Sequence, residues 1–381
     1  MTNEMLRSDD TKPVRLLVAL ELSLSKWGLS AAVEGQPRKR VKAVAGGDYP
    51  ALLEAVTEFK VRFKLPLDAP VVFCYEAGRD GFYPYRRLTE LGHDVWVIDS
   101  ASIEVSRHRR NAKSDGIDAD KLVELMQRKA GGERRALRIV RVPNASVEDQ
   151  RQLPRERETL LTDRRRLLNQ IESVLFLHGY REMPQSSGAL KDWLEQPREL
   201  GAQLRERLQR DVERLALVES QLAGVEKRMK EQLHEEQSGS IGRVALALMQ
   251  LCGIGLIGAW VLASEIYGWR QFRNRKEVGS ALGLTPTPYS SGNDQREQGI
   301  SKAGNKRARS LLVELSWLWL RYQPDSALSR WFRERFSGGG KRLRRIGIVA
   351  VARRLAVALW RYTAQGVVPD GARLKSAATA V

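Results

Sequence analysis

The sequence has few of the residues that build disulfide scaffolds or zinc sites. Its 381 residues include two cysteines, Cys74 and Cys252, and four histidines. Both cysteines lie in apolar runs, which predicts buried thiols in a reducing compartment and no disulfide framework. The scattered histidines and cysteines also lack the spacing typical of zinc ligands, which argues against a zinc-based function.

An uninterrupted apolar run is missing as well. The first ten residues, MTNEMLRSDD, contain no apolar core of a signal peptide, so we expect a cytoplasmic protein. Residues 244–263 are apolar over a length that could span a membrane, but Gln250 and the glycines 253, 255 and 258 interrupt them. Basic residues flank both ends, so no orientation is favoured. We therefore expect a buried helix–turn–helix here and no membrane partner.

Negative charge is scarce. The chain has 46 Asp and Glu against 64 Lys and Arg, which gives a formal net charge of +18. Such an excess predicts polyanionic partners, with nucleic acid first and an anionic membrane surface second. A basic surface without a partner is the alternative, but the clustering of the positive charge argues against it. The length is sufficient for two or three domains.

Residues 14–130 carry the strand and helix signals of a mixed α/β domain. Three consecutive β-type segments come first, followed by a helix, a strand, a helix, a strand and a last helix. Three antiparallel strands followed by βα crossovers give a mixed sheet with helices packed on it. This is the order of the ribonuclease H-like fold, which we assign to residues 1–130, with a linker over 131–149.

The remainder is predicted to be helical. Apolar residues recur at heptad spacing from residue 150 onward, for example at Leu153, Leu160, Leu167 and Val174. This pattern predicts a long antiparallel coiled-coil hairpin over residues 150–238, which would serve as a spacer or as a dimerisation arm. Residues 239–381 predict a mostly helical domain. We expect breaks at TPTPYSSGNDQREQG and at SGGGKRLRR, the latter being part of a flexible basic segment for nucleic-acid backbone or a solvated charge run.

Four carboxylates are candidates for a metal site. Asp115 and Asp118 share one helix face, although capping of that helix accounts for one or two acids on its own. Glu21 and Glu76 end the first and fourth strands, which are neighbours in the inferred sheet order. Four converging carboxylates repel by roughly 4 kcal/mol per pair at about 4 Å, so they require protons or divalent cations.

Oxygen ligands of this kind favour Mg²⁺ or Mn²⁺. Two such ions about 3.5–4 Å apart would activate a hydroxyl or water and steady the leaving oxygen of a phosphodiester. Basic side chains beside the acids would hold the nucleic-acid backbone, and the candidates are Arg109, Arg110 and Lys113.

Five stretches together resemble the DEDD transposases of the insertion-sequence one-ten family, including its eleven-eleven branch. They are LVALELSLSKWGL, CYEAGRDGFYPYRRL, VIDSASIEVSRHRRNAKSDGIDADKL, LCGIGLIGAWVLASEI and GLTPTPYSSGNDQREQGISKAGNKRARSLLVEL. The resemblance implies a RuvC-like catalytic domain, a coiled-coil middle, a C-terminal transposase domain and a structured non-coding RNA that pairs with target and donor DNA. The family's DEDD acids correspond to Glu21, Glu76, Asp115 and Asp118. The first departs from the common pattern, which has Asp there.

The resemblance also implies a C-terminal serine nucleophile that acts together with the DEDD metals. The matching stretch contains Ser290 and Ser291, and we choose Ser291 because it directly precedes Gly292. No histidine lies nearby to activate a hydroxyl, so the chemistry requires metal coordination and basic residues that bind phosphate. The candidates are Arg296, Lys302, Lys306, Arg307 and Arg309. A simple Ser-Ser-Gly turn is the alternative.

The stretch CGIG resembles a helix–hairpin–helix turn. Amides of Gly253 and Gly255 at a helix start could bind a phosphate, or the glycines could simply let two helices pack closely. The leading function is an RNA-guided transposase or recombinase, a homo-oligomer (dimer or tetramer) acting on bacterial nucleoid DNA. The alternatives are a structure-specific nuclease of the Holliday-junction resolvase kind and a non-enzymatic DNA-binding regulator whose acids are caps.

Overall fold

A computed structural model describes residues 13–78, 81–99, 115–133, 136–235, 239–291 and 294–375. For residues 115–118, 288–291 and 294–298 it describes the backbone alone. The chain forms two compact units, Met1–Val142 and Pro143–Val381, and each is described by itself.

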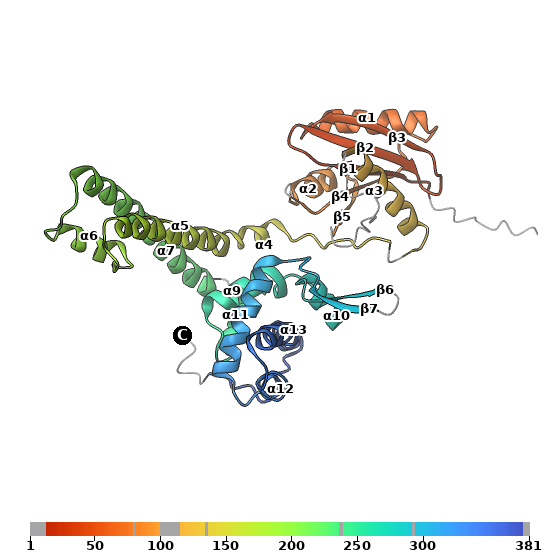
Figure 1. The fold of residues 1–381 in the computed structure, drawn as a ribbon. Coiled ribbons are helices and arrows are strands. Elements are labelled where there is room, and N and C mark those ends of the chain that lie inside the picture. The colour runs from red at the N-terminus through yellow and green to blue at the C-terminus, as the bar shows by residue number, and fades with distance from the viewer. Residues whose placement is uncertain are drawn as a thin grey trace, which may run out of the picture. The chain divides into compact units, whose positions relative to one another are not determined.

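The first unit is built on a five-stranded mixed sheet (Figure 1). Its spatial order is β3-β2-β1-β4-β5, and the strands are β1 (Leu16–Glu21), β2 (Lys26–Val33), β3 (Lys39–Ala45), β4 (Val71–Glu76) and β5 (Asp94–Ile98). The first three strands pair antiparallel, whereas β1 with β4 and β4 with β5 are parallel. This order confirms the predicted ribonuclease H-like sheet.

Helices cover both faces of this sheet. Leu16, Val18 and Leu20 face the core formed with helices α1 (Tyr49–Arg62) and α2 (Tyr83–Glu90). Leu17 and Ala19 face the opposite side, in the core formed with helix α3 (Asp115–Ala130). Successive side chains of a strand point to opposite faces, so burial on both faces explains why β1 reads as a continuous apolar run.

Part of the segment that we expected to be a linker packs in the first unit. Leu137 is buried in the core beneath α3, and Ile139 forms an isolated antiparallel bridge with Ile98. The amide of Val140 donates to the carbonyl of Val97 at 2.7 Å. The first unit therefore extends to residue 142, and the short helix α4 (Ala145–Asp149) already lies in the second unit.

Two long helices follow α4 in the second unit, α5 (Gln152–Leu177) and α7 (Ala202–Glu235), with α6 (Ser187–Glu195) between them in sequence. Side-chain bonds join α5 to α7, and as the residue number rises along α5, the number of its partner on α7 falls. Arg157 bonds Glu226, Arg164 bonds Glu219 and Gln170 bonds Asp211, at 2.7, 2.9 and 3.1 Å. The pair is therefore antiparallel, and the predicted long helical hairpin is confirmed.

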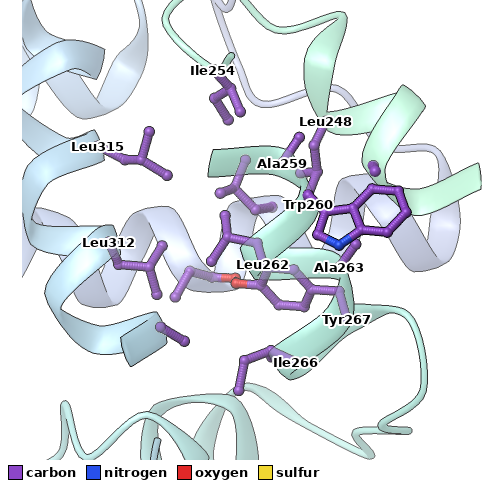
Figure 2. Packing of buried hydrophobic residues seen from close by; sticks show 14 of the residues in the cluster. Leu248, Ile254, Ala259, Trp260, Leu262, Ala263, Ile266, Tyr267, Leu312 and Leu315 are labelled. Atoms are coloured by element: carbon purple, nitrogen blue, oxygen red, sulfur yellow. The ribbon is translucent and has the colours of Figure 1, made fainter. Parts of the chain in front are cut away.

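The rest of the second unit is helical except for one hairpin. Its elements are α8 (Ser240–Met249), α9 (Leu256–Leu262), the π-helix η3 (Ala263–Tyr267), α10 (Arg275–Ala281), β6 (Pro286–Ser291), β7 (Asp294–Ile300), α11 (Lys306–Tyr322), α12 (Ala327–Phe336) and α13 (Lys341–Gln365). They surround a core that contains Trp260, Tyr267 and Leu312 (Figure 2). Tyr267 is anchored there because its hydroxyl donates to the carbonyl of Ala356 at 2.8 Å.

Three expectations about this region can now be judged. The buried helix–turn–helix over 244–263 is confirmed as α8 and α9. Within the described part of the chain, no helix has both the length and the apolar character needed to cross a membrane. The expectation of a flexible segment at GGGKRLRRIG is wrong, because α13 begins directly at Lys341 after a Gly340 N-cap.

Candidate functional site

The two glutamates of the predicted metal site lie side by side at one edge of the sheet. Strands β1 and β4 are parallel, and Leu20 is in register with Tyr75, so Glu21 and Glu76 are the next residues of neighbouring strands. Ala19 and Cys74, two residues earlier, belong to the core beneath α3. Because side chains alternate along a strand, both carboxylates leave the sheet on the face that α3 covers.

Helix α3 runs antiparallel to β1, which brings its first turn to the same edge. Near the end of α3, the Gln127 side-chain amide donates to the carbonyl of Val33, at 2.7 Å. Val33 pairs with Leu16 at the beginning of β1. Ala119, near the start of α3, instead lines a pocket together with Glu21, the last residue of β1.

Asp115 and Asp118 therefore lie on the turn of α3 that approaches Glu21. Asp118 directly precedes Ala119, and Asp115 precedes it by about 6 Å of helix. The structure thus brings the backbone positions of all four predicted acids to one sheet edge. Among the residues with described side chains, it shows no group of three or more potential metal ligands. The oxygen-only donor set of the two glutamates and two aspartates suits a hard divalent cation.

The pocket at this edge has a volume of about 330 Å³ and combines charges of both signs. Its lining includes Glu21, Lys26, Lys42 and, directly opposite Glu21 in the register, Gly28. A Cβ atom at Gly28 would lie 3.6 Å from the Cβ of Glu21, so the glycine leaves room beside the carboxylate. The ammonium group of Lys42 pairs with Glu58 of α1 at 2.6 Å, so Lys26 is the basic residue of this lining that we consider for a phosphate contact.

The third aspartate of the cluster, Asp120, has a structural contact that sequence reasoning did not identify. The hydroxyl of Ser30, which is fully buried on β2, donates to its Oδ1 at 2.5 Å. This bond and the Gln127 contact fix α3 on the sheet at two points. No sequence signal identified Ser30, because a lone serine in a strand has many possible partners.

The predicted serine loop is a β-hairpin. Ser291 is the last residue of β6 and pairs with Asp294, the first residue of β7. Ser290 pairs with Gln295, one step further from the tip. A Gly-Asn pair between two strand-like runs is a hairpin signal that the sequence reading passed over.

The base of the hairpin is firmly tied to the helical core. The amides of Ser301 and Lys302 donate to the carbonyls of Thr285 and Gly283, at 2.8 and 3.0 Å. At Gly304, with φ +102°, a Cβ atom would lie 2.4 Å from the carbonyl oxygen of Ala281, so only glycine fits. These contacts tie the start of β6 and the end of β7 to the helical core.

The predicted basic residues have several different environments. Arg309 donates to the carbonyl of Leu282 at 3.0 Å and supports the hairpin base, and Arg307 pairs with Glu158 of α5 at 2.5 Å. Lys306 is exposed in the first turn of α11, and Lys302 is an exposed residue with φ +56° beside it. Arg296 belongs to β7, where the structure describes the backbone alone. The residues Arg109, Arg110 and Lys113 lie outside the described residues.

The two glycines of CGIG also differ. A Cβ atom at Gly253, with φ +91°, would lie 3.3 Å from the Cβ of Tyr322, so this glycine serves close packing against α11. Gly255 is the N-cap of α9, and a Cβ atom there would meet nothing within 4 Å. Helix packing thus explains Gly253, and Gly255 stays a candidate for phosphate binding.

A buried acid joins the hairpin base to the long helices. Glu265 of η3 is 2% exposed and accepts hydrogen bonds from Arg155 of α5 at 2.9 and 3.3 Å. It also accepts one from the side-chain amide of Asn305 at 2.8 Å, while Asn305 caps α11 through the amide of Ala308. Burial alone would raise the pKa of Glu265, but Arg155, Asn305 and Arg151 lower it below the ordinary glutamate value.

Sequence reasoning missed Glu265. The signal was present, since it is the single acid in the apolar stretch 244–267. The neighbouring Arg151 is 4% exposed, and this burial lowers its pKa to about 10.

Comparisons with known proteins match both units. A family model described as transposase of the IS116/IS110/IS902 family matches residues 245–331, and a DEDD transposase model of the IS110 type matches residues 42–179. The candidate transposase y4rJ of Sinorhizobium fredii is 38% identical over 376 residues, which cover 95% of each chain. The transposase for insertion sequence element IS1328 of Yersinia enterocolitica is 26% identical over 304 residues, 78% of this chain and 85% of its own. The transposase for IS1111A of Coxiella burnetii is 23% identical over 281 residues, 72% of this chain and 73% of its own.

Proposed function

The chain belongs to the IS116/IS110/IS902 family of transposases, enzymes that cleave and transfer DNA strands, and we propose that Glu21, Glu76, Asp115 and Asp118 form its metal site and Ser291 its nucleophile. The observation that carries the metal site is the register of β1 and β4, which sets Glu21 beside Glu76 at the edge approached by the first turn of α3.

The DEDD domain implies use of a divalent metal, and two Mg²⁺ or Mn²⁺ ions suit this donor set. Metal bound there would supply Lewis-acid polarisation of the phosphodiester. The chain's own contribution is to hold the four carboxylates on rigid elements, two strand ends and one helix start. The departure at Glu21 moves its carboxylate one methylene further from the strand, and the small Gly28 opposite gives it the space to adjust.

The assignment of Ser291 as the nucleophile is supported by its place on the β6–β7 hairpin. Ser291 is the last residue of β6, and the base of the hairpin is held by the contacts of Gly283, Thr285 and Gly304. Attack of the serine oxygen on phosphorus would form a phosphoserine ester and release one DNA hydroxyl. Rejoining then reverses the step with a second DNA hydroxyl, so the energy of the phosphodiester is conserved and no ATP is needed.

The proposal has three further parts. A structured non-coding RNA guides the protein, the α5–α7 pair joins chains into a dimer or tetramer, and the chain is a member of the eleven-eleven branch. The strong positive charge supports an RNA partner. The branch assignment rests on the motifs quoted above, and the relative IS1111A shares 23% identity over 281 residues.

The proposal is tested with a suicide DNA substrate and Mg²⁺, using native protein and the Ser290→Ala, Ser291→Ala and Asp115→Asn variants. We expect a protein–DNA adduct on a denaturing gel for native protein and for Ser290→Ala, and none for the other two. An adduct that survives Ser291→Ala and is lost in Ser290→Ala would assign the other serine. Metal-dependent cutting without any adduct in native protein would contradict the serine mechanism and favour the resolvase alternative.

A further inference from the structure

The corner between α12 and α13 carries a dense basic surface, which combines the KRLRR stretch noted in the sequence with arginines of α12. Its side chains come from the last turn of α12 and the start of α13, and all are exposed. We call it the corner surface, formed by Arg333, Arg335, Lys341, Arg342, Arg344 and Arg345.

The basic residues at the start of α13 are placed unfavourably with respect to both the helix dipole and one another. Four of the first five residues of α13 are basic, at the helix end whose dipole favours acids. Lys341 lies three and four residues from Arg344 and Arg345, which is the spacing of like-charge repulsion on a helix. From Lys341 to Gln365, α13 contains no Asp or Glu.

Nothing in the described part of the chain compensates these charges. The structure shows no ion pair or side-chain hydrogen bond for the four basic residues at the start of α13 among the described residues. Each such charge at a helix N-terminus costs about 0.3–1 kcal/mol. A local rule broken without internal compensation is typical of a functional surface.

The corner surface is nevertheless held rigidly. A Cβ atom at Gly347 would lie 2.6 Å from a ring carbon of Phe336 and 2.9 Å from one of Phe332, so α12 and α13 cross in close contact. Phe332 and Phe336 form a small core with Ile348 and Val351. The spacing of the charges is therefore fixed before any ligand binds, which reduces the entropy cost of binding.

We infer that the corner surface binds the phosphodiester backbone of a nucleic acid. Lys341 to Arg345 span about 6 Å of helix, which is close to the axial length of two nucleotide steps of one DNA strand, at about 3.4 Å per step. Contacts of this kind position the nucleic acid and do not read its sequence. The inference rests on the proposed function only in taking nucleic acid as the partner.

The test compares two variants of equal charge. The corner variant is Lys341→Gln/Arg342→Gln/Arg344→Gln/Arg345→Gln. The control removes four exposed basic residues from α5, α6 and α7, as Arg165→Gln/Lys191→Gln/Arg210→Gln/Lys230→Gln. Fluorescence anisotropy measures binding of full-length protein to a 30-base-pair DNA duplex and to an RNA hairpin between about 50 and 300 mM KCl.

We expect the corner variant to lower the slope of log affinity against log salt by about 2–3 for at least one nucleic acid, because each lost phosphate contact removes about 0.7–0.9. Affinity at 150 mM salt should fall about tenfold or more, and the control should change the slope by less than about 1. Loss with DNA alone or with RNA alone identifies which backbone binds. Equal effects of the two variants, or no effect of the corner variant on either ligand, would overturn the inference.

Folding is checked by thermal unfolding, where the corner variant should be at least as stable as native protein because repulsion is removed. Adduct formation is a separate readout. If native protein forms no adduct while the corner variant still loses salt-dependent binding, the proposed serine mechanism fails and the corner surface stands.

Discussion

Replacement of Glu265 by glutamine tests the buried network that connects η3, α5 and α11. The change preserves shape but removes the negative charge facing Arg155, and it turns an amide N–H₂ group toward donors. Truncating one partner of a buried ion pair costs about 3–5 kcal/mol. The side chain of Arg155 is 33% exposed, so water screens part of the loss and we expect about 3 kcal/mol.

Thermal unfolding of the full chain at pH 7, followed by circular dichroism, measures this effect. For a unit of this size, about 3 kcal/mol lowers Tm by roughly 6–12 °C. The matched control is Glu226→Gln, which breaks the pair with Arg157 at 2.7 Å, where the side chains are 23% and 39% exposed. That variant should lose no more than about 1 kcal/mol.

The same network predicts a defined pH dependence. The pKa of Glu265 is lowered in the folded chain, so its stabilisation is fully present above the unfolded pKa, about 4.3, and is lost as the pH falls through the folded pKa. The Tm difference between native protein and Glu265→Gln should therefore be constant near neutral pH and shrink below about pH 4. Equal Tm values for Glu265→Gln and Glu226→Gln at pH 7 would refute the reasoning.

Three further predictions use the same molecule. Asp115→Asn should abolish Mg²⁺-dependent cleavage without weakening DNA binding in anisotropy, whereas Glu21→Asp should remain partly active because it restores the family's usual residue. Ser30→Ala should cost about 1–3 kcal/mol in urea unfolding, because the Asp120 carboxylate loses its donor, and an unchanged midpoint would contradict that contact. Gly347→Ala should destabilise through its clash with Phe336, whereas Gly224→Ala, with open space around it, should stabilise by up to about 1 kcal/mol; both signs are checked by Tm.

The local pattern of apolar and polar residues predicted the strands and helices of the first unit. The same pattern together with the quoted motifs predicted the family. Alternating and continuous apolar runs gave the strands, and their order gave the ribonuclease H-like sheet, because few topologies satisfy the rules for connections. The heptad trace gave the long helix pair. The family models and relatives confirm the transposase prediction, while the metal ligands, the serine and the RNA stay predictions.

Prediction from the local sequence pattern was wrong where the structure of a segment depends on contacts with residues distant in sequence. The linker prediction covered residues 137–140, but Leu137 is buried in the core beneath α3 and Ile139 bridges to Ile98, contacts that the local sequence does not reveal. The segment GGGKRLRRIG was predicted to be flexible, yet α13 begins at Lys341, and its Gly347 packs against Phe332 and Phe336. In both places the deciding contacts join residues that sequence spacing does not relate.

The sequence alone determined that acids follow two apolar strands and begin one helix, since burial and capping are local preferences of the chain. Only the tertiary structure decided that these acids share one edge, because that depends on the parallel register of β1 with β4 and on the direction of α3. The same is true of Glu265, whose partners Arg155 and Asn305 lie 110 and 40 residues away. Hydrogen bonds and ion pairs act through space over a few ångströms, so chain order cannot assign their partners.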